Sequence, residues 1–117
     1  MICHVTVNTH DLKSSIEFYS WLLGLPVARR FPTPEGEIAF LGSGETKLEL
    51  IESRGYHRTA PADGISVGFG VDNLEEKIAL LAQREIPVSP VTAPAPGTRF
   101  CFFTDLNGIH IQLIEQK

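Results

Sequence analysis

Four polar residues occupy matching places in the two halves of this 117-residue sequence. His4 and Ser66 are 62 residues apart, and Glu49 and Gln112 are 63 apart. Each lies in a segment where polar and apolar residues alternate, so in a β-strand the polar side chains would share one face. Imidazole and carboxylate groups bind divalent metals, and a carboxylate also accepts protons. Such a face suits either a ligand cleft or exposure to solvent.

The same spacing recurs along the chain and indicates a duplicated unit. LELIE at 48–52 is echoed by IQLIE at 111–115, and LPV at 25–27 is echoed by IPV at 86–88 at an offset of 61. A third echo, at an offset of 62, joins the two segments with helical periodicity. Three echoes in order at nearly one offset predict two similar structural units.

Each half follows the same order of elements. Alternating β-branched residues predict strands, and apolar residues at helical spacing predict one helix in each half. The fold class is therefore α+β, with the order βαβββ occurring twice. We expect one domain over 1–117, made of repeats at about 1–53 and 64–117 with a linker at 54–63. The expected strands are 2–8, 25–31, 37–42 and 46–52, then 65–71, 87–92, 98–104 and 109–115, and the expected helices are 12–23 and 73–85.

Composition excludes several classes of protein. The net charge of −4 gives no electrostatic reason to expect nucleic acid or an anionic membrane surface as a partner. The longest apolar run is far shorter than the roughly 18 residues that a membrane span needs. Cys3 and Cys101 are too few for a disulfide framework. With no visible signal peptide, we expect a cytoplasmic protein.

Several segments together resemble the vicinal oxygen chelate superfamily, which includes glyoxalase I, bleomycin resistance proteins and extradiol dioxygenases. The resemblance is carried by HVTVNTHDLKSSIEFYSWLLGLPV at the start and TDLNGIHIQLIE at the end, with KLELIE and GVDNLEEKIALL between them. It implies the glyoxalase-type fold, in which two βαβββ modules curl their strands around a metal or ligand cleft. That fold agrees with the order of elements derived from the residues.

The resemblance also implies a set of metal ligands, because members with a metal take one ligand from the first strand and one from the last strand of each module. It assigns His4, Glu49 and Gln112 as ligands of a divalent ion such as zinc, nickel, manganese or iron. Ser66 stands where glyoxalase I has a histidine, and Gln112 where most active members have a glutamate. With Glu49 as the only charged ligand, a divalent ion would keep one net positive charge, which would favour an anionic ligand. Glu49 is the only carboxylate among these positions and therefore the catalytic candidate.

Four further residues are candidates for the substrate cleft. Ser66 is small and leaves room for a ligand or water. His110 shares the strand face of Gln112, where it is either a substrate contact or an exposed residue with a local hydrogen bond. Phe102 belongs to a dense group of phenylalanines that forms either an aromatic wall for an apolar ligand or part of the core. Arg99 meets an anionic ligand if its side of the strand faces inward, and is otherwise solvated.

Three functions remain open, the third being a pseudo-enzyme that acts as a structural partner. The first is a metal-dependent lyase or isomerase that acts on a small carbonyl or thiol-adduct substrate. Asn8 and Ser53 stand where glyoxalase I typically has the arginine and asparagine that contact glutathione, so a standard lactoylglutathione lyase is disfavoured. The second is a metal-free protein that sequesters a small drug or toxin, as the bleomycin resistance members do. In each case a homodimer is expected.

Overall fold

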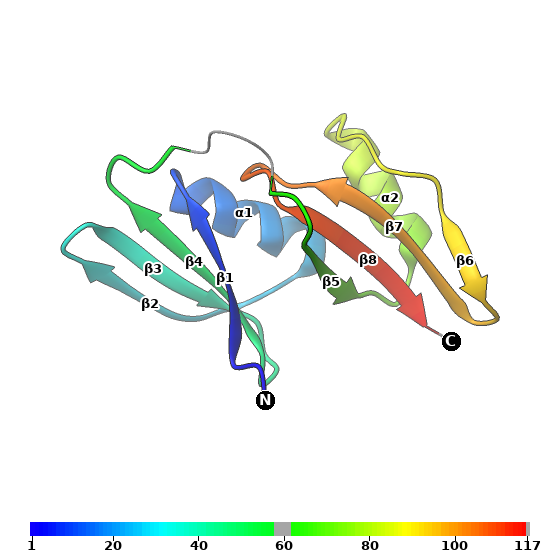
Figure 1. Ribbon diagram of the computed structural model, residues 1–117, viewed down its shortest axis with the longest axis horizontal. Coiled ribbons are helices and arrows are strands. Elements are labelled where there is room, and N and C mark those ends of the chain that lie inside the picture. The colour runs from blue at the N-terminus through cyan, green and yellow to red at the C-terminus, as the bar shows by residue number, and fades with distance from the viewer. Residues whose placement is uncertain (58–61, 117) are drawn as a thin grey trace. The chain divides into compact units, whose positions relative to one another are not determined.

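The computed structural model describes residues 1–57 and 62–116. The chain divides into two compact units, Met1–Thr59 and Ala60–Lys117. This division falls within the linker expected at 54–63, of which 58–61 lie outside the described residues. Each unit is built from one helix and four strands (Figure 1).

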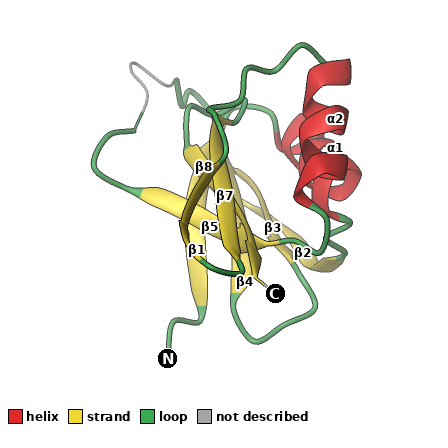
Figure 2. Cartoon of the chain, turned by 90° about the vertical axis from the view of Figure 1, so that its right-hand side faces the viewer, coloured by secondary structure: helices red, strands yellow, loops and turns green. Residues whose placement is uncertain are grey.

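In the first unit, one helix covers one face of a four-stranded sheet. The strand order is β1-β4-β3-β2, with β1 parallel to β4 and the other neighbours antiparallel. Helix α1 packs on β3 and β4 from one side of the sheet (Figure 2). The opposite face of this sheet therefore carries no helix of the same unit. The elements are β1 (His4–Thr9), α1 (Leu12–Leu23), β2 (Val27–Thr33), β3 (Gly36–Leu41) and β4 (Lys47–Ser53).

Local chemistry explains where α1 begins and ends. The Asp11 side chain accepts a hydrogen bond from the backbone N–H of Ser14, which caps the start of the helix. Gly24 ends it with a left-handed backbone at φ 64°, a conformation that glycine adopts without strain. Tyr19 and Leu22 are fully buried on the face that meets the sheet. The helix expected at 12–23 is confirmed.

The second unit repeats the plan. Its strand order is β5-β8-β7-β6, with β5 parallel to β8 and the other neighbours antiparallel. Helix α2 packs on β8. The prediction of an α+β protein with two βαβββ modules is therefore confirmed. The elements are β5 (Ser66–Gly70), α2 (Leu74–Gln83), β6 (Thr92–Ala95), β7 (Thr98–Thr104) and β8 (His110–Gln116).

The second strand of this unit differs from the expectation. It was expected at 87–92, whereas β6 covers Thr92–Ala95. Pro87 and Pro90 have no backbone N–H to donate to a strand ladder, so the segment before β6 makes only isolated contacts. One of these is the hydrogen bond from Ser89 N to the Phe102 carbonyl, at 2.9 Å.

Both helices are tied to the last strand of their own unit by a glutamate. Glu52 Oε2 accepts the backbone N–H of Leu12 at 2.6 Å, and Glu115 Oε2 accepts that of Leu74 at 2.9 Å. A carboxylate at a helix N-terminus satisfies an otherwise unpaired donor and complements the helix dipole. The same contact thus occurs in both repeats. Neither helix in the described part of the chain is long and apolar enough to cross a membrane.

Candidate functional site

The open face of the first unit, meaning the sheet face turned away from α1, brings together two of the predicted site residues. His4 lies at the start of β1, and Glu49 lies on β4 opposite Thr6. His4 Nε2 is 3.4 Å from Glu49 Oε1. Thr6 Oγ1 donates a hydrogen bond to the same carboxylate oxygen at 2.6 Å. The alternation that predicted a shared face for His4 and Glu49 therefore corresponds to a direct contact.

The two side chains differ in exposure. The Glu49 side chain is 12% exposed, and that of His4 is 42% exposed. A carboxylate that is largely removed from water needs polar partners, and Thr6 and His4 provide them. Thr6 also restricts the orientation of the carboxylate. Glu49 is thus held in one place, while His4 remains accessible from solvent.

The distance between the two donor atoms fits a shared metal ion. Metal–nitrogen and metal–oxygen bonds of about 2.1 Å at a tetrahedral angle place two donors about 3.4 Å apart. His4 Nε2 and Glu49 Oε1 have this separation. Within residues 1–57 and 62–116 no group of three or more His, Cys, Asp and Glu side chains is placed to hold a metal. A complete coordination sphere would therefore need other donors, such as an amide oxygen, water or substrate.

Gln112 lies in the second unit, at the centre of its open face, which is the face turned away from α2. Its strand neighbours are Gly68 on β5 and Phe102 on β7. A Cβ atom added at Gly68 would lie 3.1 Å from Gln112 Oε1, so the amide extends across the glycine. Within its own unit Gln112 occupies the position that Glu49 has in the first, where Thr6 takes the place of Gly68.

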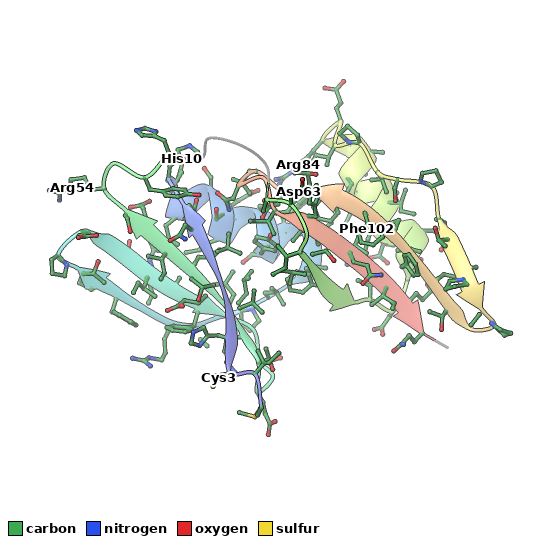
Figure 3. All side chains as sticks on the ribbon, in the orientation of Figure 1. Cys3, His10, Arg54, Asp63, Arg84 and Phe102 are labelled. Carbon is green, nitrogen blue, oxygen red and sulfur yellow. The ribbon has the colours of Figure 1, made fainter. Side chains whose placement is uncertain are left out.

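Ser66, His110 and Phe102 surround one hollow on this second open face. It measures about 390 Å³ and is completed by Gly64 and Ile65. Phe102 lies on β7 with 36% of its surface exposed (Figure 3). The structure thus brings three of the predicted cleft residues together.

Phe102 and His110 also line a second hollow. It measures about 350 Å³ and is also lined by the Pro87–Ser89 segment and by Thr104. Thr104 Oγ1 lies 3.4 Å from His110 Nδ1, which orients the ring. The partly exposed side chain of Phe102 therefore lines both hollows.

Arg99 does not join these residues. It lies on the face of β7 that carries the buried Cys101, so its side chain points toward α2. There it pairs with Glu75 of α2, and its Nη1 is 3.3 Å from Glu115 Oε1. The hydrogen bond that Arg99 donates to Glu75 raises the pKa of Arg99 above its usual value. Both acidic partners come from distant segments, so the local sequence did not reveal which way Arg99 points.

Two contacts around His4 went unrecognised in the sequence. Strand alternation puts Thr6 on the same face as His4, but its hydrogen bond to Glu49 could not be read from the sequence. Phe40, opposite Glu49 on β3, meets the His4 ring edge-on, with 5.6 Å between centroids. The sequence signal for this contact is an aromatic residue on β3 that lies on the same sheet face as Glu49.

Paired βαβββ modules with polar residues on the open faces define the class of protein. The family model of the Glyoxalase/Bleomycin resistance protein/Dioxygenase superfamily matches residues 1–113. The chain therefore belongs to this superfamily, as the sequence resemblance predicted.

Similar proteins include enzymes and a binding protein. The lactoylglutathione lyase of Escherichia coli O157:H7 is 29% identical over 99% of this chain and 93% of its own length. The trypanothione-dependent glyoxalase I of Leishmania major has a TM-score of 0.84 at 25% identity, covering 98% of this chain and 86% of that one. TnmS3, an antibiotic binding protein from Streptomyces sp. CB03234, has a TM-score of 0.77 at 18% identity over 100% and 96% of the two chains. The last likeness shows a shared fold alone.

Proposed function

We propose that this protein is a metal-dependent lyase or isomerase that acts on a small carbonyl or thiol-adduct substrate. In this proposal His4, Glu49 and Gln112 hold one divalent ion. The observation that carries it is the 3.4 Å contact between His4 Nε2 and Glu49 Oε1, with Thr6 bonded to the same oxygen. The separation of the two donors fits a shared ion.

The residues around Glu49 suit proton transfer. A bound divalent ion would supply Lewis-acid polarisation of the substrate oxygens. Glu49 is the only carboxylate among the four matched positions, so it is the proposed acceptor of a proton next to the carbonyl. Thr6 keeps one carboxylate oxygen in place, and Phe40 restricts the His4 ring from the side.

The substrate proposed here differs from that of a lactoylglutathione lyase. Asn8 and Ser53 occupy the positions where the resemblance would require an arginine and an asparagine for glutathione. The identity to the E. coli lyase is 29%, which supports common ancestry without fixing the substrate. We therefore propose an adduct of a smaller thiol, or another small carbonyl compound.

A turnover assay tests the proposal. Metal-loaded protein would be given the hemithioacetals that methylglyoxal forms with 2-mercaptoethanol and with glutathione. Glu49→Gln should lower turnover of the preferred adduct by roughly 100-fold or more, the range for loss of a general base. Glu45→Gln, at an exposed position, is the matched control and should keep wild-type turnover. Turnover that survives Glu49→Gln would contradict the role of Glu49, and preference for glutathione would contradict the proposed substrate.

A second candidate is supported by the hollows beside Phe102. An exposed aromatic side chain that lines two hollows suits an apolar ligand, and Ser66 and Gln112 stand where stronger metal ligands would be expected. The alternative is a metal-free protein that sequesters a drug or toxin. Two results together would favour it. Wild-type protein would bind metal-free bleomycin saturably and turn over neither adduct, and Phe102→Ala would weaken the binding. Absence of such binding would reject this form of the alternative.

We also propose that the protein works as a homodimer. β1 and β5 are outer strands of their sheets, and the apolar residues just before them, Ile2 and Ile65, are 68% and 61% exposed. Outer strands with apolar flanks can pair with another copy. Sedimentation should give twice the protomer mass of 12.9 kDa, whereas a single 12.9 kDa species at micromolar concentration would contradict the dimer.

A further inference from the structure

We propose that Arg29, supported by Phe31 and Phe40, is a carboxylate-binding subsite beside the His4–Glu49 pair. The substrate would then carry a carboxylate joined through an apolar chain to its reacting carbonyl group. This inference rests on the proposed function, because it extends the same site.

Arg29 lies against two aromatic rings on the open face of the first unit. It pairs in register with Phe40 across β2 and β3. Its Cζ atom is 5.1 Å from the centroid of the Phe31 ring and 5.7 Å from that of Phe40. The two rings are themselves stacked, with 6.3 Å between centroids and 28° between planes. The guanidinium group is therefore held on an aromatic surface.

This support suits recognition of a carboxylate. A guanidinium attracted to the face of a ring keeps its N–H donors available at its edge. Those donors match the two oxygens of a carboxylate and can form two parallel hydrogen bonds with it. Because the rings already restrict the side chain, less conformational entropy is lost when an anion binds.

Arg30 and Arg99 are held in ion pairs, whereas Arg29 is available. Among the described residues Arg29 makes no ion pair. The neighbouring Arg30 lies on the opposite face of β2 and bonds to Glu37 through Nε at 2.5 Å and Nη2 at 3.1 Å. Arg99 is held by Glu75 and Glu115. Strand alternation thus gives two adjacent arginines different roles, one in an ion pair and one available to a ligand.

Phe40 connects this subsite to the His4–Glu49 pair. The His4 ring meets one side of Phe40 at 5.6 Å, and Arg29 Cζ lies 5.7 Å from the same ring. The sum of these two distances limits the separation between the guanidinium and the imidazole to about 11 Å. A molecule with a carbonyl at one end and a carboxylate at the other can span that gap, with its apolar chain over Phe40.

Binding of a matched pair of ligands tests the subsite. The probes are 6-oxoheptanoate and its neutral amide, 6-oxoheptanamide, titrated calorimetrically into zinc-loaded and zinc-free protein. Wild-type protein should bind the carboxylate roughly five- to tenfold more tightly than the amide, as expected for an exposed charge-assisted contact. Arg29→Gln should abolish this preference, and Arg29→Lys should keep only part of it. Arg30→Gln is the matched control and should keep the wild-type ratio.

The outcomes separate this inference from the proposed function. Equal binding of the two probes by wild-type protein overturns the subsite, and so does a preference that survives Arg29→Gln. Loss of the preference in Arg30→Gln as well would also overturn it, because the effect would then follow net charge. If the carboxylate preference depends on Arg29 while no adduct is turned over, the subsite stands and the proposed reaction falls. Urea denaturation of each variant confirms that the ratios refer to folded protein.

Discussion

Thr6 determines how the Glu49 carboxylate is presented. Its hydroxyl donates to Glu49 Oε1 at 2.6 Å from the neighbouring strand. Groups that hydrogen-bond to metal ligands typically contribute 10- to 100-fold to metal affinity. Thr6→Val should therefore weaken zinc binding by roughly tenfold, measured by competition with a chelator. Thr92→Val, at an exposed position on β6, should leave the affinity unchanged. Equal affinities for the Thr6 variant and wild type would show that Thr6 has no part in the site.

The two cysteines should differ sharply in reactivity. Cys3 is exposed near the start of β1 (Figure 3), whereas Cys101 is fully buried, and its burial raises the pKa of its thiol. Burial keeps reagents away from the Cys101 thiol, and the raised pKa lowers the fraction of that thiol that is ionised. Ellman titration at pH 8 should find one fast thiol in native protein and a second only after denaturation. Cys3→Ser should remove the fast phase, and a fast phase that persists in this variant would contradict the buried position of Cys101.

At the scale of elements, the glutamate at the end of each last strand stabilises its helix. Glu115 is 3% exposed, accepts the Leu74 N–H, and lies near Arg99. Glu115→Ala leaves a buried donor and an arginine without this partner, and should destabilise the protein by about 3 kcal/mol. Urea denaturation measures the effect. Glu45→Ala, at an exposed position, should change stability little, and an equally small effect of Glu115→Ala would contradict the capping role.

The cap of α1 predicts a dependence of stability on acid. Hydrogen bonds from the Ser14 backbone and side chain lower the pKa of Asp11 below its usual 3.8. A carboxylate with a lowered folded-state pKa stabilises the fold above the unfolded pKa, and this contribution is lost as the pH falls through the folded value. Asp11→Asn keeps an acceptor without that titration, so its stability should fall less than that of wild type below about pH 3.8. Identical acid profiles in thermal melts would contradict this assignment.

The elements also show what the sequence can and cannot predict. Helix α1 was predicted residue by residue because its cap, its apolar stripe and Gly24 are all local signals. β6 was misplaced because proline positions and a distant partner strand decide where pairing begins. The open-face positions of His4 and Glu49 follow from alternation alone. The direction of Arg99 depends on Glu75 and Glu115, which only the folded chain brings near.

At the scale of the whole molecule, the two repeats share a fold but differ in chemistry. The first has a histidine and a glutamate in contact on its open face. The second has Ser66 and Gln112 at the matching positions and two hollows beside Phe102. Duplication accounts for the common scaffold, and the two open faces have diverged: His4 and Glu49 in the first repeat correspond to Ser66 and Gln112 in the second.

Metal retention tests the central proposal most directly. Protein stripped with chelator would be loaded separately with zinc, nickel, manganese or iron(II), desalted, and analysed for metal per chain. The proposal predicts one ion per wild-type chain for at least one metal, loss of that ion in His4→Ala and Glu49→Ala, and weaker retention in Gln112→Ala. Glu37→Ala, which removes an acidic group paired with Arg30 on the opposite face of its sheet, should retain the ion. No retention by wild-type protein, or retention unaffected by His4→Ala and Glu49→Ala, would contradict it.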